Sequence, residues 1–151
     1  MKPLVILLVV FGSACLATFV SNKTVDHIFA GQLAMAVMLV FTSIGHFKFV
    51  KGMAMMLPPF IPLKPAVVYV TGVMEIMFGV GLLFEQVRVT VAWAIIIFFV
   101  LLLPANIYAA QKKVNLEQAN YEGNGLNYLW FRVPLQVFFI GWVYYFAVMN
   151  G

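Results

Sequence analysis

The stretch VYVTGVMEIMFGVGLL, residues 68–83, is apolar almost throughout and has a carboxylate, Glu75, at its middle. About 20 apolar residues in an α-helix cross the hydrocarbon core of a bilayer, which is ~30 Å thick. An ionised carboxylate at the centre of such a helix costs at least ~2.5 kcal/mol, so membrane acids usually face other protein groups and pair with them. The stretch predicts a transmembrane helix and raises the question of which groups contact Glu75.

The whole chain has the same apolar character. Hydrophobic residues make up 64% of its 151 residues and charged residues only 9%, whereas a soluble domain is about half apolar and a quarter charged. The longest polar stretch, 111–125, is typical of a loop and leaves no room for a soluble catalytic domain. Five windows are apolar enough to span a membrane: 3–21, 28–50, 66–84, 89–109 and 126–149. We therefore predict an all-α, multi-pass integral membrane protein, in a bacterial inner membrane.

The first window also resembles a secretory signal peptide, because Lys2 precedes a short apolar run that contains small residues. The apolar run continues through Thr18, Phe19 and Val20, which favours a transmembrane helix.

Lysine and arginine predict the orientation, because basic residues in short loops stay in the cytoplasm. Lys23 and Arg88 lie on one side of the predicted membrane. Six lysines lie on the side of the N-terminus: Lys2, Lys48, Lys51, Lys64, Lys112 and Lys113. We expect a cytoplasmic N-terminus and an external C-terminus. The net charge of +4 is typical of basic loops beside anionic lipid, and without a nucleic-acid motif we expect the bilayer, and no nucleic acid, as a partner.

Polar residues inside the spans recur three or four positions apart and so share helix faces. The stripes are Thr42, Ser43 and His46; Thr71, Gly72, Glu75 and Gly79; and Tyr128, Arg132 and Gln136, with Asn106 in the fourth span. Glu75 and Gln136 both lie roughly 13 to 15 Å deep at 1.5 Å per residue.

Arg132, one turn shallower than Gln136, is the predicted ion-pair partner of Glu75, because no other charged group lies at that depth. If Arg132 is out of reach, burial favours a protonated Glu75. The pair either fixes helix register, as polar groups in membrane bundles often do, or lines a pocket that opens toward the cytoplasm.

Metal and thiol chemistry find little support in the sequence. The histidines, His27 and His46, are nearly twenty residues apart, or close to 30 Å along one helix, so one chain cannot clamp a haem between them. A single cysteine excludes an internal dithiol, and the methionines at 53–56 are more typical of apolar packing than of copper. We expect no metal. The segment 56–65 holds four prolines and predicts a non-helical connection that lies over the cytoplasmic mouth or in the headgroup layer.

Five short motifs resemble the DoxX-like family of small integral membrane proteins: IGHF at 44–47, LPPFIP at 57–62, TGVMEI at 71–76, LLPANIY at 102–108 and RVPLQ at 132–136. The resemblance implies a four-helix membrane bundle over residues 28–149, with residues 1–27 as an additional helix and external loop. It also implies that the family's polar positions fall on His46, Glu75, Asn106, Arg132 and Gln136.

Two functions follow as hypotheses. In the first, these five residues bind a small lipophilic molecule, such as a quinone, between aromatic walls formed by Phe47, Tyr69, Tyr108 and Trp130. Without a flavin, haem or iron–sulfur motif, the chain is then at most an accessory subunit of a quinone-linked oxidoreductase, and catalytic residues are unknown.

In the second hypothesis, the protein is a non-enzymatic chaperone or scaffold for other membrane proteins. Ala30 and Ala34 then offer a close helix contact, although they are as suited to packing within the monomer. A proton-coupled transporter has only Glu75 in its favour, because the five spans contain no inverted repeat.

Overall fold

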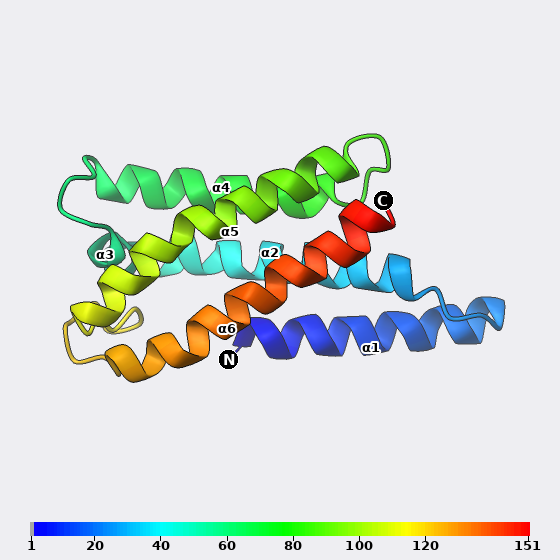
Figure 1. Cartoon of the computed structure of the whole chain (residues 1–151), viewed down its shortest axis with the longest axis horizontal. Coiled ribbons are helices and arrows are strands. Elements are labelled where there is room, and N and C mark those ends of the chain that lie inside the picture. Colours follow the sequence, from blue (N-terminus) through cyan, green and yellow to red (C-terminus); the bar gives the residue numbers. More distant parts are fainter. Residues whose placement is uncertain (1) are drawn as a thin grey trace.

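The computed structural model describes residues 2–151, which fold into an all-α bundle (Figure 1). Its elements are α1 (Lys2–Asn22), α2 (His27–Lys48), α3 (Val50–Met56), α4 (Lys64–Gly81), α5 (Arg88–Gln111), α6 (Leu126–Val143) and the π-helix η1 (Tyr144–Met149). Five helical segments of 18 to 24 residues are long and apolar enough to cross a membrane, with α6 and η1 forming one of them. The predicted five spans are confirmed, and the chain is a multi-pass integral membrane protein.

The helix α2 lies at the centre of the bundle and packs against α1 on one side and α4 on the other, while α5 packs against α6. The end formed by α3 and the 112–125 loop, at the left of Figure 1, is here named the lysine-rich end; the opposite end is the C-terminal end. The helix α1 is displaced toward the C-terminal end, so its first residues lie beside the middle of α6 (Figure 1).

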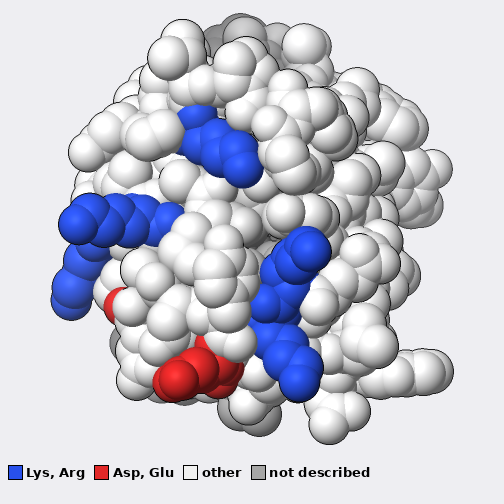
Figure 2. Space-filling model, turned by 90° about the vertical axis from the view of Figure 1, so that its left-hand side faces the viewer, with Lys and Arg blue, Asp and Glu red and all other residues white. Residues whose placement is uncertain are grey.

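The lysine-rich end is named for the lysines at the helix termini that meet there. Lys48 ends α2, Lys51 lies in α3, Lys64 begins α4, and Lys112 and Lys113 follow α5. Figure 2 looks onto this end and shows basic side chains spread around it, with an acidic patch at one edge.

The short helix α3 was not predicted, because the second window was expected to continue as one helix to residue 50. The chain instead bends at Phe49, and α3 folds back across the lysine-rich end. Gly52 packs directly on the Leu116 carbonyl, where any Cβ would overlap it. The Lys64 ammonium donates a 2.8 Å hydrogen bond to the Leu57 carbonyl and so ties the proline segment to α4.

The hydrophobic core lies in the middle and C-terminal part of the bundle. Its fully buried members include Met35 and Leu39 of α2, Ile95 of α5 and Val143 of α6. The helices α2 and α4 approach closely because Gly79 carries no side chain: a Cβ there would lie 2.8 Å from the Ala36 carbonyl oxygen. This close contact decides which residues Glu75 meets.

Candidate functional site

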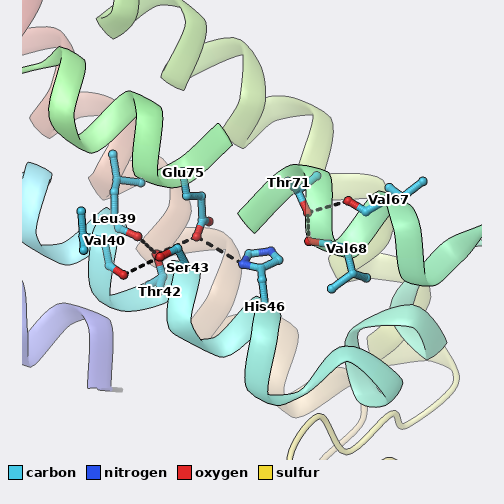
Figure 3. Close-up of polar contacts among 9 residues, drawn as sticks. All are labelled: Leu39, Val40, Thr42, Ser43, His46, Val67, Val68, Thr71 and Glu75. Carbon is cyan, nitrogen blue, oxygen red and sulfur yellow. Dashed lines mark hydrogen bonds and ion pairs between the residues drawn. The ribbon is translucent and has the colours of Figure 1, made fainter. Parts of the chain in front are cut away.

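Glu75 lies in the contact between α4 and α2 and is 4% exposed. Its Oε2 atom is 3.0 Å from the Thr42 hydroxyl and 3.3 Å from His46 Nδ1 (Figure 3). The Thr42 hydroxyl also lies 2.9 Å from the Leu39 carbonyl and has one proton to donate to either oxygen.

The predicted ion pair between Glu75 and Arg132 is not formed. Within residues 2–151 the basic groups that lie within 4 Å of a carboxylate are His46 and, at the surface, Lys2. The reason is helix order: α4 packs against α2, whereas Arg132 is on α6, which packs against α5. The sequence identified the polar face of α4 that carries Glu75 but did not reveal which helix this face meets.

His46 is held in place by a glycine on the facing helix. A Cβ at Gly72 would lie 2.7 Å from His46 Cβ, so the imidazole lies where a side chain of α4 would otherwise stand. One edge of the ring points toward Glu75 and the other toward Thr71 (Figure 3). The Thr71 hydroxyl itself lies within hydrogen-bond distance of the carbonyls of its own helix, at Val67 and Val68.

A second polar cluster joins α5 to α6. Arg132 donates from Nη1 to Asn106 Oδ1 at 2.7 Å and from Nη2 to the Tyr128 hydroxyl at 3.2 Å. Its guanidinium also lies 4.5 Å from the centre of the Tyr128 ring. Asn106 donates in turn to Gln136 Oε1 at 3.1 Å, and Gln136 donates to the Phe99 carbonyl. The cluster is a directed chain of donors that starts at Arg132 and ends at a backbone oxygen.

The direction of this chain determines what the cluster can still bind. Each amide oxygen already accepts a hydrogen bond from the next residue, so the spare hydrogen-bonding groups are mainly N–H donors. Arg132 has five such donors, of which two are engaged within the chain. The site therefore suits a ligand that presents acceptor oxygens.

Asn106 and Arg132 border three cavities. The first, of about 250 Å³, lies beneath the 112–125 loop and includes Glu117 and Glu122 in its lining. The second, of about 160 Å³, is enclosed by α2, α3, α4 and α5 and has His46 on its wall. The third, of about 180 Å³, lies along α5 and α6 beside Pro3 of α1 and reaches Gln136.

The cavities bring together most of the residues that the sequence singled out. His46, Asn106 and Arg132 border the second cavity and Gln136 the third, while Glu75 lies behind His46. Met53, Met56 and Leu57 border the second cavity, so α3 and the start of the proline segment form a lid over it, whereas Phe60 and Leu63 of the same segment are exposed.

The predicted aromatic walls lie elsewhere. Phe47 and Tyr69 are 42% and 46% exposed and pack on each other with ring centres 5.9 Å apart, and Trp130 is 82% exposed. Neither these three nor Tyr108 is among the residues that border the three cavities. Phe47 follows His46, and one residue turns a helix face by about 100°, which carries its ring outward. Aliphatic residues such as Val68 and Leu102 form the walls instead.

The sequence analysis missed a polar contact at the C-terminal end. Gln32, only 3% exposed, donates a 2.8 Å hydrogen bond to the Phe146 carbonyl in η1, and the Trp142 indole donates to the Gly31 carbonyl at 3.0 Å. An amide inside an apolar window was the available signal. Ala30 and Ala34 are fully buried, so they pack within the chain and offer no outward contact surface.

Comparison with known proteins places the chain in a family. A family model matches residues 35–147, well over half of the chain. The chain belongs to the family "Domain of unknown function (DUF8561)". No curated protein and no solved structure matches it. The matching model carries no DoxX-like description, so that resemblance rests on the five short motifs alone.

This DUF8561 match covers the residues of both polar clusters and leaves α1 outside it. The predicted division of the chain at residues 27 and 28 stays a prediction.

Proposed function

We propose that this protein binds a small lipophilic molecule of the quinone class inside the membrane and serves as the membrane accessory subunit of a quinone-linked redox enzyme. The observation that carries the proposal is Arg132, an intramembrane guanidinium with spare donors at the junction of three cavities. Quinone oxygens are acceptors and match these donors. The DoxX-like resemblance of the five motifs favours the same class.

The apolar part of such a ligand has a place beside the polar cluster. The third cavity is walled by Phe99, Leu102, Phe131, Leu135 and Phe139, and Arg132 and Gln136 lie on its polar side. A small number of polar groups on an otherwise apolar wall is the usual composition of a small-molecule site. Leu102, Asn106 and Arg132 border both the second and the third cavity. In this arrangement the ring lies in the second cavity with one oxygen at Arg132, and the tail follows the aromatic wall of the third.

The orientation of the protein follows from its lysines. With the lysine-rich end in the cytoplasm, the first cavity and its two glutamates open to cytoplasmic water. In this proposal a partner protein on that side exchanges electrons with the bound quinone, and this chain positions the ring.

The test is mass spectrometry of lipophilic molecules extracted from protein purified in native membrane discs. Wild type is compared with Arg132→Met and with a matched control, Arg88→Met. Arg88 donates to the Leu82 carbonyl at the C-terminal end of the bundle and does not border the three cavities. We expect a quinone enriched in wild type and in Arg88→Met and reduced at least tenfold in Arg132→Met.

Two outcomes would overturn the proposal. One is bulk lipid alone in wild type, which would leave the membrane chaperone or scaffold as the better reading. The other is equal enrichment in wild type and Arg132→Met, which would place the ligand elsewhere on the chain.

A further inference from the structure

The second cavity is bordered by hydrogen-bonding groups of different kinds. Asn106 and Arg132 come from α5 and α6, and His46 comes from α2. Thr71 and the aliphatic residues Val67 and Val68 of α4 also line it. Donors from two helices and an imidazole from a third therefore border one small cavity.

The orientation of the imidazole is set by Glu75. His46 Nδ1 is buried, lies 3.3 Å from Glu75 Oε2, and makes no hydrogen bond of good geometry. Arg132 is out of reach of Glu75, and His46 and Thr42 are instead the polar partners of its side chain. An ionised Glu75 favours a proton on Nδ1, because an N–H facing an acceptor is stabilised and a lone pair facing it is repelled. With the proton on Nδ1, a neutral imidazole presents a lone pair at Nε2, which is on the ring edge away from Glu75 (Figure 3).

No side chain in residues 2–151 hydrogen-bonds Nε2. The His46 side chain is 12% exposed, and Nε2 is not among the buried polar atoms that lack a partner, so its exposed part includes this atom. Thr71, toward which that edge points in Figure 3, directs its own hydroxyl at the backbone carbonyls of Val67 and Val68. An acceptor is thus available on the cavity wall.

We propose that His46 Nε2 accepts a hydrogen bond from a hydroxyl of the bound molecule, so that the site prefers a hydroquinone to the oxidised quinone. This inference rests on the proposed function and adds the oxidation level of its ligand. A hydroquinone offers a hydroxyl to His46 and an acceptor oxygen to Arg132. A quinone offers acceptors alone and leaves Nε2 unpaired, which costs affinity because the lone pair loses its water.

The same geometry supports a proton transfer without electron transfer. The O–H bond of the hydroxyl breaks, an N–H bond forms at Nε2, and the ligand keeps the electron pair as an oxyanion. The imidazolium that results faces the Glu75 carboxylate at 3.3 Å, and the Thr42 hydroxyl lies 3.0 Å from the same carboxylate. Glu75 acts here as a positioning residue, since it contacts His46 and does not border the cavity.

The first experiment measures the tautomer of His46 by ¹⁵N NMR of histidine-labelled protein in membrane discs. His27, the exposed first residue of α2, is replaced by His27→Asn so that His46 gives the only signal. We expect the proton on Nδ1 in this background, and Glu75→Gln to shift the population toward Nε2–H because an amide can donate to Nδ1. An Nε2–H tautomer in the wild-type site would overturn the inference.

The second experiment measures binding of a short-chain benzoquinone and its hydroquinone under anaerobic conditions. We expect wild type to bind the hydroquinone at least tenfold more tightly than the quinone, and His46→Gln and Glu75→Gln each to lose most of this preference, measured as the ratio of the two dissociation constants within each variant. The control is Ser43→Ala, a buried neighbour whose hydroxyl bonds back to the Val40 carbonyl; it should keep the preference.

The failures of the two proposals are distinguishable. If wild type binds both forms equally and Arg132→Met loses both, the proposed function stands and the role of His46 is overturned. An unchanged preference in both His46→Gln and Glu75→Gln overturns it as well. If wild type binds neither form, both proposals fall together.

Discussion

Two buried glutamines, Gln32 and Gln136, show how the two ends of the bundle differ. Both are under 10% exposed, and both donate to a backbone carbonyl of a neighbouring helical segment, Phe146 for Gln32 and Phe99 for Gln136. Around Gln32, aromatic rings pack between the helices, and the ring centres of Trp142 and Phe146 are 4.8 Å apart. Gln136 instead continues into a polar chain that ends at a guanidinium beside cavities.

Burial and residue type alone therefore do not distinguish an amide that only joins helices from an amide at a binding site. Gln32 is at the end of its network, because its partner is a carbonyl and its surroundings are apolar. Gln136 donates to the Phe99 carbonyl. The next carbonyl along α5, that of Val100, lacks its usual helical donor because residue 104 is a proline and has no N–H. At the lysine-rich end, polar groups remain with spare donors, and that is the property a ligand requires.

The largest effect should come from filling the glycine contacts at either end. Gly72→Leu would push into His46, and Gly31→Leu would overlap the Phe146 ring. Overpacking of this kind typically costs about 1–3 kcal/mol, so both variants should unfold earlier on heating in membrane discs, and only Gly72→Leu should also reduce ligand binding. The control is Gly12→Leu, since nothing lies within 4 Å of a Cβ there. A control as unstable as the two test variants would contradict the packing argument.

The two glutamines themselves give the next effect. Gln32→Leu and Gln136→Leu each remove one hydrogen bond between helical segments, which in membrane proteins contributes about 0.6 kcal/mol on average and up to about 2. We expect similar, modest losses of stability in both, measured by unfolding in detergent. Quinone binding should fall at least tenfold in Gln136→Leu and stay within twofold in Gln32→Leu. Equal losses of binding would erase the distinction between the two ends.

Much of the fold was predictable from the sequence, because membrane helices are specified by length and apolarity. The five predicted windows match the helical spans within three residues at every end. The short helix α3 was not predictable in this way, since it depends on Gly52 packing against the backbone of the 112–125 loop.

The partners within the site were less predictable. A helical stripe says which face is polar, but not which helix it meets, so Glu75 was assigned to Arg132 although α4 contacts α2. The glycines 72 and 79 that bring α4 against α2 were visible in the stripe, yet their partner helix was not. Of the predicted wall residues, Phe47 and Tyr69 border none of the three cavities, because each lies one residue out of phase with its polar stripe.

A smaller effect is expected at the lid over the second cavity. Lys64→Met removes the hydrogen bond to the Leu57 carbonyl that ties the proline segment to α4. The lid should then open more often, and a cysteine introduced by Met53→Cys in a Cys15→Ser background should react severalfold faster with a soluble maleimide. The matched control is Lys51→Met on α3, whose side chain makes no hydrogen bond or ion pair among residues 2–151. Equal labelling rates in the two variants would mean that Lys64 does not hold the lid.

The smallest effect should come from the ion pair between Lys2 and Glu117, which links α1 to the 112–125 loop at 3.1 Å. Both side chains are largely exposed, at 74% and 61%, and exposed pairs contribute about 0–1 kcal/mol because water and salt screen them. A double-mutant cycle of Lys2→Gln and Glu117→Gln should therefore give a coupling below about 0.5 kcal/mol. Ligand binding should not change, because the amide and guanidinium donors that border the second and third cavities belong to α5 and α6. A larger coupling, or weaker quinone binding in either variant, would extend the site to α1, whose Pro3 borders the third cavity.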